Sequence, residues 1–160
     1  MSFKQYALFP SNPATERGIS TKLSASKDRI VYASGKTIVI RDLKNPKSSI
    51  SYNGHIQNAT IARISPSGYY CASGDAGGTV RVWDTVGEDH ALKGEYKVIS
   101  GRINDLEWDG ESKRIIAVGD GKEKFGHAFM MDTGTSTGVI SGHFKAVNAV
   151  SIRHQRPFRA

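Results

Sequence analysis

The chain has 160 residues, of which 38% are hydrophobic and 17 are glycine, and its 22 Lys and Arg outnumber its 15 Asp and Glu for a formal net charge of +7. No segment approaches the roughly 20 apolar residues that cross a bilayer, and the first residues lack the apolar run of a secretory signal, so no membrane role is expected. The basic residues are spread along the chain without a block of five like charges, which gives little support to nucleic acid as a partner.

The first element expected along the chain is a lone strand over residues 3–9, where apolar and polar residues alternate. Residues 1–18 are assigned to this strand and to a lead-in. A lone terminal strand of this kind can pair with a distant part of the chain.

Three later segments share one pattern: a short apolar strand, a Gly-containing turn, a second alternating strand and an Asp. They cover residues 29–43, 69–85 and 114–133, and their closing residues, Asp42, Asp84 and Asp132, lie 42 and 48 residues apart. A period of about 40–45 residues with four short strands per unit is typical of WD-repeat propellers.

Dipeptides at the borders of these units support the repeat. The second unit opens with Gly54-His55 and closes with Trp83-Asp84, which makes it one complete repeat. The other units carry related or weaker pairs at the same places: Arg41-Asp42, Gly101-Arg102, Met131-Asp132 and Gly142-His143.

Turn residues and strand periodicity agree with an all-β chain. Residues 65–68 (Ser-Pro-Ser-Gly) and 109–112 (Asp-Gly-Glu-Ser) have turn chemistry between apolar runs. In residues 79–84 side chains alternate between two faces, and no window shows a helical period. The single cysteine, Cys71, lies in an apolar run and is expected to be a core residue of a protein from a reducing compartment such as the cytoplasm.

The predicted fold is therefore a WD-repeat β-propeller with about three and a half four-stranded blades of a larger ring. The blades are assigned to residues 19–52, 53–99 and 100–141, and residues 142–160 are expected to begin a fourth, with a first strand over 146–152. Propellers close into a ring of at least about four blades, so we expect either a fragment of a longer protein or completion by another chain.

The Gly-His pairs point to a structural hydrogen-bond network. In WD repeats this His bonds within a set of Ser or Thr, Asp and Trp, and the second unit offers His55, Ser73 and Trp83, while His143 is the corresponding residue of the fourth. The usual Asp position, six residues before Trp83, is occupied by Gly77, and the spacing leaves open whether the nearby Asp75 takes its place.

No chemistry-bearing pattern is found. The five histidines form no HExxH, HxH or Cys/His ligand spacing. The glycine-rich residues 74–78 and 119–121 lack phosphate-loop spacing and a following helix, so they are expected to be hairpin turns. We therefore expect a binding scaffold and not an enzyme, with no metal, no cofactor and no small-molecule substrate.

The most suggestive segment is residues 121–126 (Gly-Lys-Glu-Lys-Phe-Gly), which lengthen the third unit. They lie between its second and third strands, at the end of the blade that carries the Gly-His loops. Either their charged and aromatic side chains meet a partner at a loop tip, or Phe125 is buried against the next blade.

Five stretches in order resemble the N-terminal propeller of the actin-interacting protein 1 family: residues 16–18, 65–85, 94–108, 112–129 and 141–160. The resemblance implies a pair of linked seven-bladed propellers that binds actin filaments together with cofilin, promotes filament disassembly and belongs to the cytoplasmic actin cytoskeleton. It makes Lys122, Glu123, Lys124 and Phe125 the first candidates for contact with actin or cofilin, followed by His55 and Asp75 on the same expected face.

Two other readings remain open. One is a WD-repeat interaction adaptor that is not specific for actin and recognises a peptide or a modified tail. The other is a propeller associated with nucleic acid, suggested by the net charge of +7, which would bind with a steep salt dependence.

Overall fold

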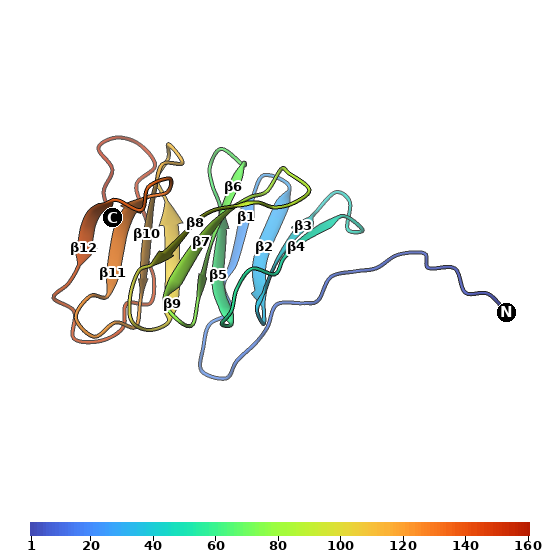
Figure 1. Cartoon of the computed structure of the whole chain (residues 1–160), viewed down its shortest axis with the longest axis horizontal. Helices are drawn as coiled ribbons and strands as arrows, with labels where there is room; N and C mark the ends of the chain where they lie inside the picture. Colours follow the sequence, from blue (N-terminus) through green and yellow to red (C-terminus); the bar gives the residue numbers. More distant parts are fainter.

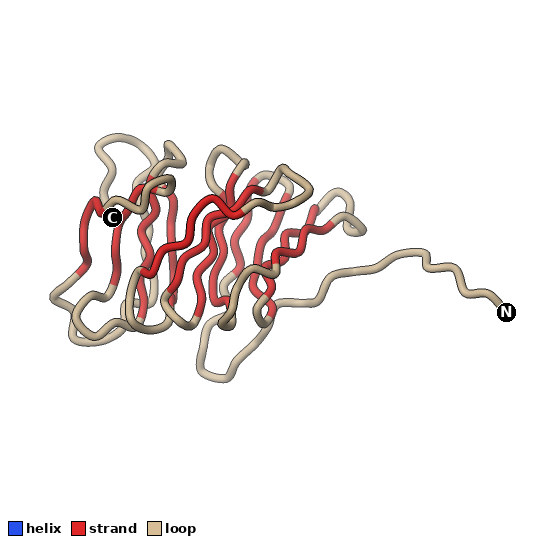
Figure 2. Tube along the Cα trace, viewed as in Figure 1, coloured by secondary structure: helices blue, strands red, loops and turns tan.

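The computed structural model describes residues 1–160 and contains twelve β-strands and no helix (Figure 2). Consistently, no helical segment long and apolar enough to cross a membrane is present. The strands form three antiparallel four-stranded sheets that stand side by side, as Figure 1 shows. The prediction of an all-β fold built of WD-type blades is confirmed.

Each sheet uses four strands that follow one another in the sequence. The first sheet contains β1 (Leu23–Ser26), β2 (Arg29–Ser34), β3 (Thr37–Asp42) and β4 (Ser49–Tyr52). The second contains β5 (Ala59–Ile64), β6 (Tyr70–Asp75), β7 (Thr79–Asp84) and β8 (Leu92–Lys97). The third contains β9 (Ile103–Trp108), β10 (Arg114–Gly119), β11 (Gly126–Met130) and β12 (Ser136–Ile140).

The alternation in β7 explains how the sheets stack. Val80 and Val82 belong to the apolar core between the second and third sheets, whereas Trp83 belongs to the core between the first and second. Because successive side chains of a strand point to opposite faces, one strand contributes to both cores. The second sheet therefore packs against a neighbouring sheet on each of its two faces.

The predicted turns at residues 65–68 and 109–112 are confirmed. The N–H of Gly68 donates to the Ser65 carbonyl at 2.8 Å, and Gly68 has a φ of 83°, which glycine adopts without a steric penalty. In the second turn, the Ser112 N–H donates to the Asp109 carbonyl at 3.1 Å.

Adjacent sheets are joined by a repeated contact along β5 and β9. The Thr60 hydroxyl of β5 donates to the Ile103 carbonyl of β9 at 2.6 Å. At the equivalent place one unit later, the Asn104 side chain of β9 donates to the Val147 carbonyl at 3.0 Å. Equivalent repeat positions thus make equivalent side chain to backbone bonds to the next segment of the chain.

The strand expected over residues 3–9 is not formed. These residues extend away from the sheets in Figure 1, and no residue before Ala14 takes part in a backbone–backbone hydrogen bond. A strand needs a neighbour for its N–H and C=O groups, and no strand of this chain lies beside this segment. Within the segment, the Tyr6 ring lies 3.9 Å from Lys47 Nζ, and just after it the Tyr32 hydroxyl donates to the Ser11 carbonyl at 2.6 Å.

Residues 142–160 likewise contain no strand. The segment nevertheless follows the third sheet, because the Val147 N–H donates to the Gly119 carbonyl at 3.1 Å and the Val150 N–H donates to Asp105 Oδ2 at 3.1 Å. That these residues begin a fourth blade stays a prediction, which their course beside β9 favours.

Candidate functional site

The buried centre of the second sheet is a hydrogen-bonded row of side chains. Ser73 Oγ lies 3.1 Å from Trp83 Nε1 and 2.7 Å from His55 Nε2, and His55 Nδ1 lies 3.2 Å from Asp75 Oδ2. An indole N–H can only donate, so Ser73 Oγ accepts from Trp83 and its own proton is free to go to His55 Nε2. This arrangement places the proton of a neutral His55 on Nδ1, where it donates to Asp75.

Asp75 belongs to this hydrogen-bonded row although it does not lie at the usual Asp position of the repeat. While its Oδ2 faces His55, its Oδ1 accepts from the N–H groups of Gly77 at 2.9 Å and Thr79 at 3.1 Å. The same carboxylate therefore closes the β6–β7 turn and holds the histidine. In the sequence, the only sign of this role was that Asp75 lies near the position where WD repeats usually carry the Asp.

Packing joins this row to the first sheet. The Tyr52 ring of β4 stacks on Trp83 with centroids 4.4 Å apart and planes 6° from parallel. Burial lowers the pKa of His55, while the neighbouring Asp75 carboxylate opposes that shift. A neutral imidazole suits this site, since it can donate on one side and accept on the other.

The structure does not offer His55 and Asp75 to a partner. Their exposed fractions are only 4% and 3%, and their polar atoms are engaged within the sheet. These two side chains therefore cannot make the partner contacts expected of them, and their position is that of structural residues. The sequence placed them at the right end of the blade but could not show which way they point.

His143 does not join the row. It lies on the exposed connection after β12, with its ring 6.1 Å from that of Phe125 in an edge-on arrangement. Its counterpart His55 is enclosed by its own complete sheet, which supplies Ser73 and Asp75. Residues 142–160 form no such sheet, so no equivalent partners surround His143.

The β10–β11 hairpin has an exposed tip on a buried foot. Lys122, Glu123 and Lys124 are exposed, whereas Phe125 is only 6% exposed. The Phe125 N–H donates to the Ile140 carbonyl and its carbonyl accepts from the Gly119 N–H, both at 2.9 Å. Phe125 thus fixes the hairpin to the sheet, and the three charged residues before it are presented to solvent.

The connections at this end of the sheets form one continuous surface, which we call the hairpin face. Backbone hydrogen bonds join one connection to the next around it. They run from Ala59 to Gly35, Ala76 to Asn58, Val98 to Gly78, Asp120 to Arg102 and Val147 to Gly119. The opposite face carries the other set of connections, including residues 64–70, 84–92 and 108–114.

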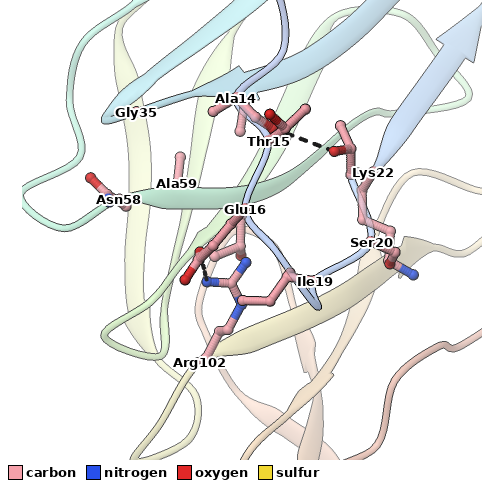
Figure 3. Close-up of a pocket in the computed structure, with 13 residues that line it drawn as sticks. Ala14, Thr15, Glu16, Ile19, Ser20, Lys22, Gly35, Asn58, Ala59 and Arg102 are labelled. Carbon is pink, nitrogen blue, oxygen red and sulfur yellow. Dashed lines mark hydrogen bonds and ion pairs between the residues drawn. The ribbon is translucent and has the colours of Figure 1, made fainter.

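A polar pocket of about 290 Å³ lies between the lead-in and the first strands of the sheets. Figure 3 shows Glu16 and Arg102 meeting there, and their charged groups are 3.8 Å apart. The pocket is lined by residues 14–16 and 19–22 of the lead-in, Ala33, Gly35, residues 58–60 and Arg102, so no local sequence pattern could reveal it. Only 4 of its 13 lining residues are hydrophobic, which makes it a poor fit for an apolar ligand.

The structure offers no metal centre: no group of three or more His, Cys, Asp or Glu side chains is placed to hold an ion. Cys71 is fully buried in the core between the first two sheets, and burial raises the pKa of its thiol. A thiol held in its protonated form within the core is not a nucleophile.

Comparison with known proteins gives matches over nearly the whole chain. The family model described as WD domain, G-beta repeat matches residues 46–84. An uncharacterized WD repeat-containing protein of Schizosaccharomyces pombe is 57% identical over 133 residues, which is 83% of this chain and 22% of that protein. Actin-interacting protein 1 of Caenorhabditis elegans is 46% identical over 159 residues, or 98% of this chain and 26% of that protein.

A third relative, WD repeat-containing protein 1 of Rattus norvegicus, is 42% identical over 161 aligned residues, which cover 99% of this chain and 27% of that protein. The chain thus spans between 22% and 27% of the length of these curated relatives. The alignments with the second and third relatives cover 98% and 99% of the chain, so they span all three sheets and the β10–β11 hairpin.

Proposed function

We infer that this chain, a member of the WD-repeat family that includes actin-interacting protein 1, is part of a scaffold that binds actin filaments. The observation that carries this proposal is the similarity itself, since proteins with that name from Caenorhabditis elegans and Drosophila melanogaster are 46% and 42% identical to the chain over 98% and 99% of its length. Binding by rigid loops on a propeller needs no catalytic group.

The β10–β11 hairpin is the proposed contact. Lys122, Glu123 and Lys124 stand exposed on a foot that Phe125 holds in the sheet. A loop fixed at its base loses little conformational entropy on binding, so its charged tip can contribute to affinity. An acidic filament surface would meet the chain's excess of positive charge, although salt limits this attraction to about 10 Å.

The finer proposal is that the scaffold acts together with cofilin and promotes filament disassembly, as the family resemblance implies. A scaffold can shift filaments toward a severed or strained state only if it binds that state more tightly than the intact filament. Loops that contact actin and cofilin at the same time would provide this difference, because only a cofilin-decorated filament offers both surfaces.

Co-sedimentation with actin filaments tests the proposal, using the intact protein that contains this chain, with and without cofilin. We expect binding that increases when cofilin is present. Two hairpin variants should change this binding: Glu123→Lys and the double variant Lys122→Glu, Lys124→Glu. The control Lys113→Glu, which alters an exposed lysine on the opposite face, should leave the binding unchanged. Unchanged binding in the hairpin variants would contradict the hairpin assignment alone, while a folded wild-type protein that stays in the supernatant would contradict the actin role.

A further inference from the structure

Two connections of the hairpin face expose a large apolar side chain at the same repeat position. Ile56 follows His55, and Phe144 follows His143, so each is the residue after a Gly-His pair. Three residues later, the N–H groups of Ala59 and Val147 donate to Gly35 and Gly119, respectively. The two loops are therefore anchored by equivalent backbone bonds, and Ile56 and Phe144 occupy equivalent places.

Both side chains are largely exposed. The exposed fraction is 70% for Ile56 and 101% for Phe144. The loop with Ile56 connects the first sheet to the second, and both sheets have all four strands, so no absent neighbour accounts for its exposure. The repeat thus buries the His in the complete blade and leaves the next residue in solvent, where an isolated apolar side chain contributes nothing to the fold.

The charged hairpin lies between these two apolar residues along the hairpin face. A hollow of about 280 Å³ is lined by Ser100, Lys122, Glu123 and Lys124. At the foot of the hairpin, Phe125 meets His143, which brings the hairpin next to the loop of Phe144. On the other side, Lys97 donates to the Gly77 carbonyl and continues the surface toward the loop of Ile56.

The connections of this face are predominantly basic. Their acidic residues are Asp120 and Glu123, apart from Asp75, which is buried against His55, and the lead-in adds Glu16, which pairs with Arg102 at 3.8 Å. Their basic residues are more numerous: Lys36, Lys97, Arg102, Lys122, Lys124 and Lys145. Apolar side chains set among charges of one sign are typical of a surface that recognises a protein of the opposite sign.

We propose that the hairpin face binds an acidic protein segment that carries apolar side chains, with Phe144 and Ile56 as its two apolar anchors and with the lysine-lined hollow receiving a carboxylate. This inference rests on the proposed function and names further contacts for it. An acidic protein fits better than a nucleic acid, because Ile56 is aliphatic and cannot stack on a base. Aromatic and large apolar residues at the centre of an interface carry most of its energy.

The test compares alanine variants of the intact protein in binding to cofilin-decorated actin filaments. Phe144→Ala and Ile56→Ala are matched by Tyr69→Ala and Val86→Ala, which remove apolar side chains exposed by 60% and 65% on the opposite face. We expect each anchor variant to raise the dissociation constant about fivefold or more, mainly through faster dissociation, because truncation of a buried anchor removes contacts formed only after docking. The controls should stay within about twofold.

The outcomes separate the two proposals. Wild-type binding with no loss in either anchor variant overturns the inference and leaves the actin role intact. No binding by the folded wild-type protein overturns the actin role, and the inference with it. Two other results would contradict the proposal. If the wild-type protein forms a dimer and Phe144→Ala dissociates it, this face binds a second copy of the chain. If the partner bound at this face dissociates with the steep salt dependence of a nucleic acid, the face binds nucleic acid.

Discussion

Replacing Ser73 with alanine tests whether the buried row in the second sheet stabilises the blade. The substitution removes one oxygen that accepts from Trp83 Nε1 at 3.1 Å and bonds His55 Nε2 at 2.7 Å. Both partners are enclosed, with exposed fractions of 0% for Trp83 and 4% for His55, so water cannot replace the lost bonds.

The expected cost follows from the two groups left without a partner. Each unsatisfied buried polar group costs about 1–3 kcal/mol, so Ser73→Ala should lower the free energy of unfolding by about 2–6 kcal/mol. Against a total stability of about 5–15 kcal/mol for a typical domain, this is a large fraction. The removed hydroxyl is small, so the remaining cavity adds little.

Urea denaturation of the intact protein, followed by tryptophan fluorescence, measures this effect. Ser51→Ala is the matched control, since Ser51 is exposed on β4 and its change should stay within about 0.5 kcal/mol. A double-mutant cycle with Trp83→Phe should give a coupling of about 1 kcal/mol or more, because each single change breaks the same bond. A Ser73→Ala variant as stable as the Ser51→Ala control would refute the reasoning.

Three further outcomes are expected. Burial lowers the pKa of His55 below the ordinary histidine value of 6.5, so at mildly acidic pH the unfolded chain binds a proton that the folded chain does not. Stability should therefore fall as the pH drops below about 6.5, and His55→Gln should flatten this dependence in melting curves from pH 5 to 8. Gly78→Ala should cost about 1–3 kcal/mol in urea denaturation, since Gly78 has a φ of 83° and a Cβ there would meet two carbonyl oxygens, whereas Gly87→Ala, which meets nothing, should be neutral; equal stabilities would contradict this. Cys71 should resist alkylation by iodoacetamide until denaturant is added, and rapid labelling of the native protein would show that its burial is wrong.

Much of the fold could be predicted because its signals are local. Strand alternation in Thr79–Asp84, turn residues at 65–68 and the regular return of a closing Asp each depend on neighbours in the sequence. The lone strand over residues 3–9 failed for the opposite reason. Alternation shows that a segment could pair, but pairing requires a second strand, and the local sequence carries no information about whether one lies beside it.

The candidate site could be predicted only in part, for the same reason. The composition of the β10–β11 hairpin marked Lys122 to Lys124 as a candidate contact, and this stays a proposal that their exposure supports. The two alternatives for Phe125 could not be separated, because burial depends on Ile140 and His143 from another strand and loop. His55 and Asp75 were assigned to the correct end of the blade, but their enclosure follows from packing against Ser73, Trp83 and Tyr52.

The sequence by itself determined the repeat, the all-β class and the family, because these rest on periodicity, turn chemistry and identity along the chain. Only the tertiary structure decided which residues of the repeat face inward and which face solvent. Ile56 and Phe144 were unremarked in the sequence, and their meaning came from two loops that are anchored alike, one between the first and second sheets and one after the third. A side chain's orientation is set by the free energy of packing among segments distant in sequence, and that balance is resolved only when the sheets stack.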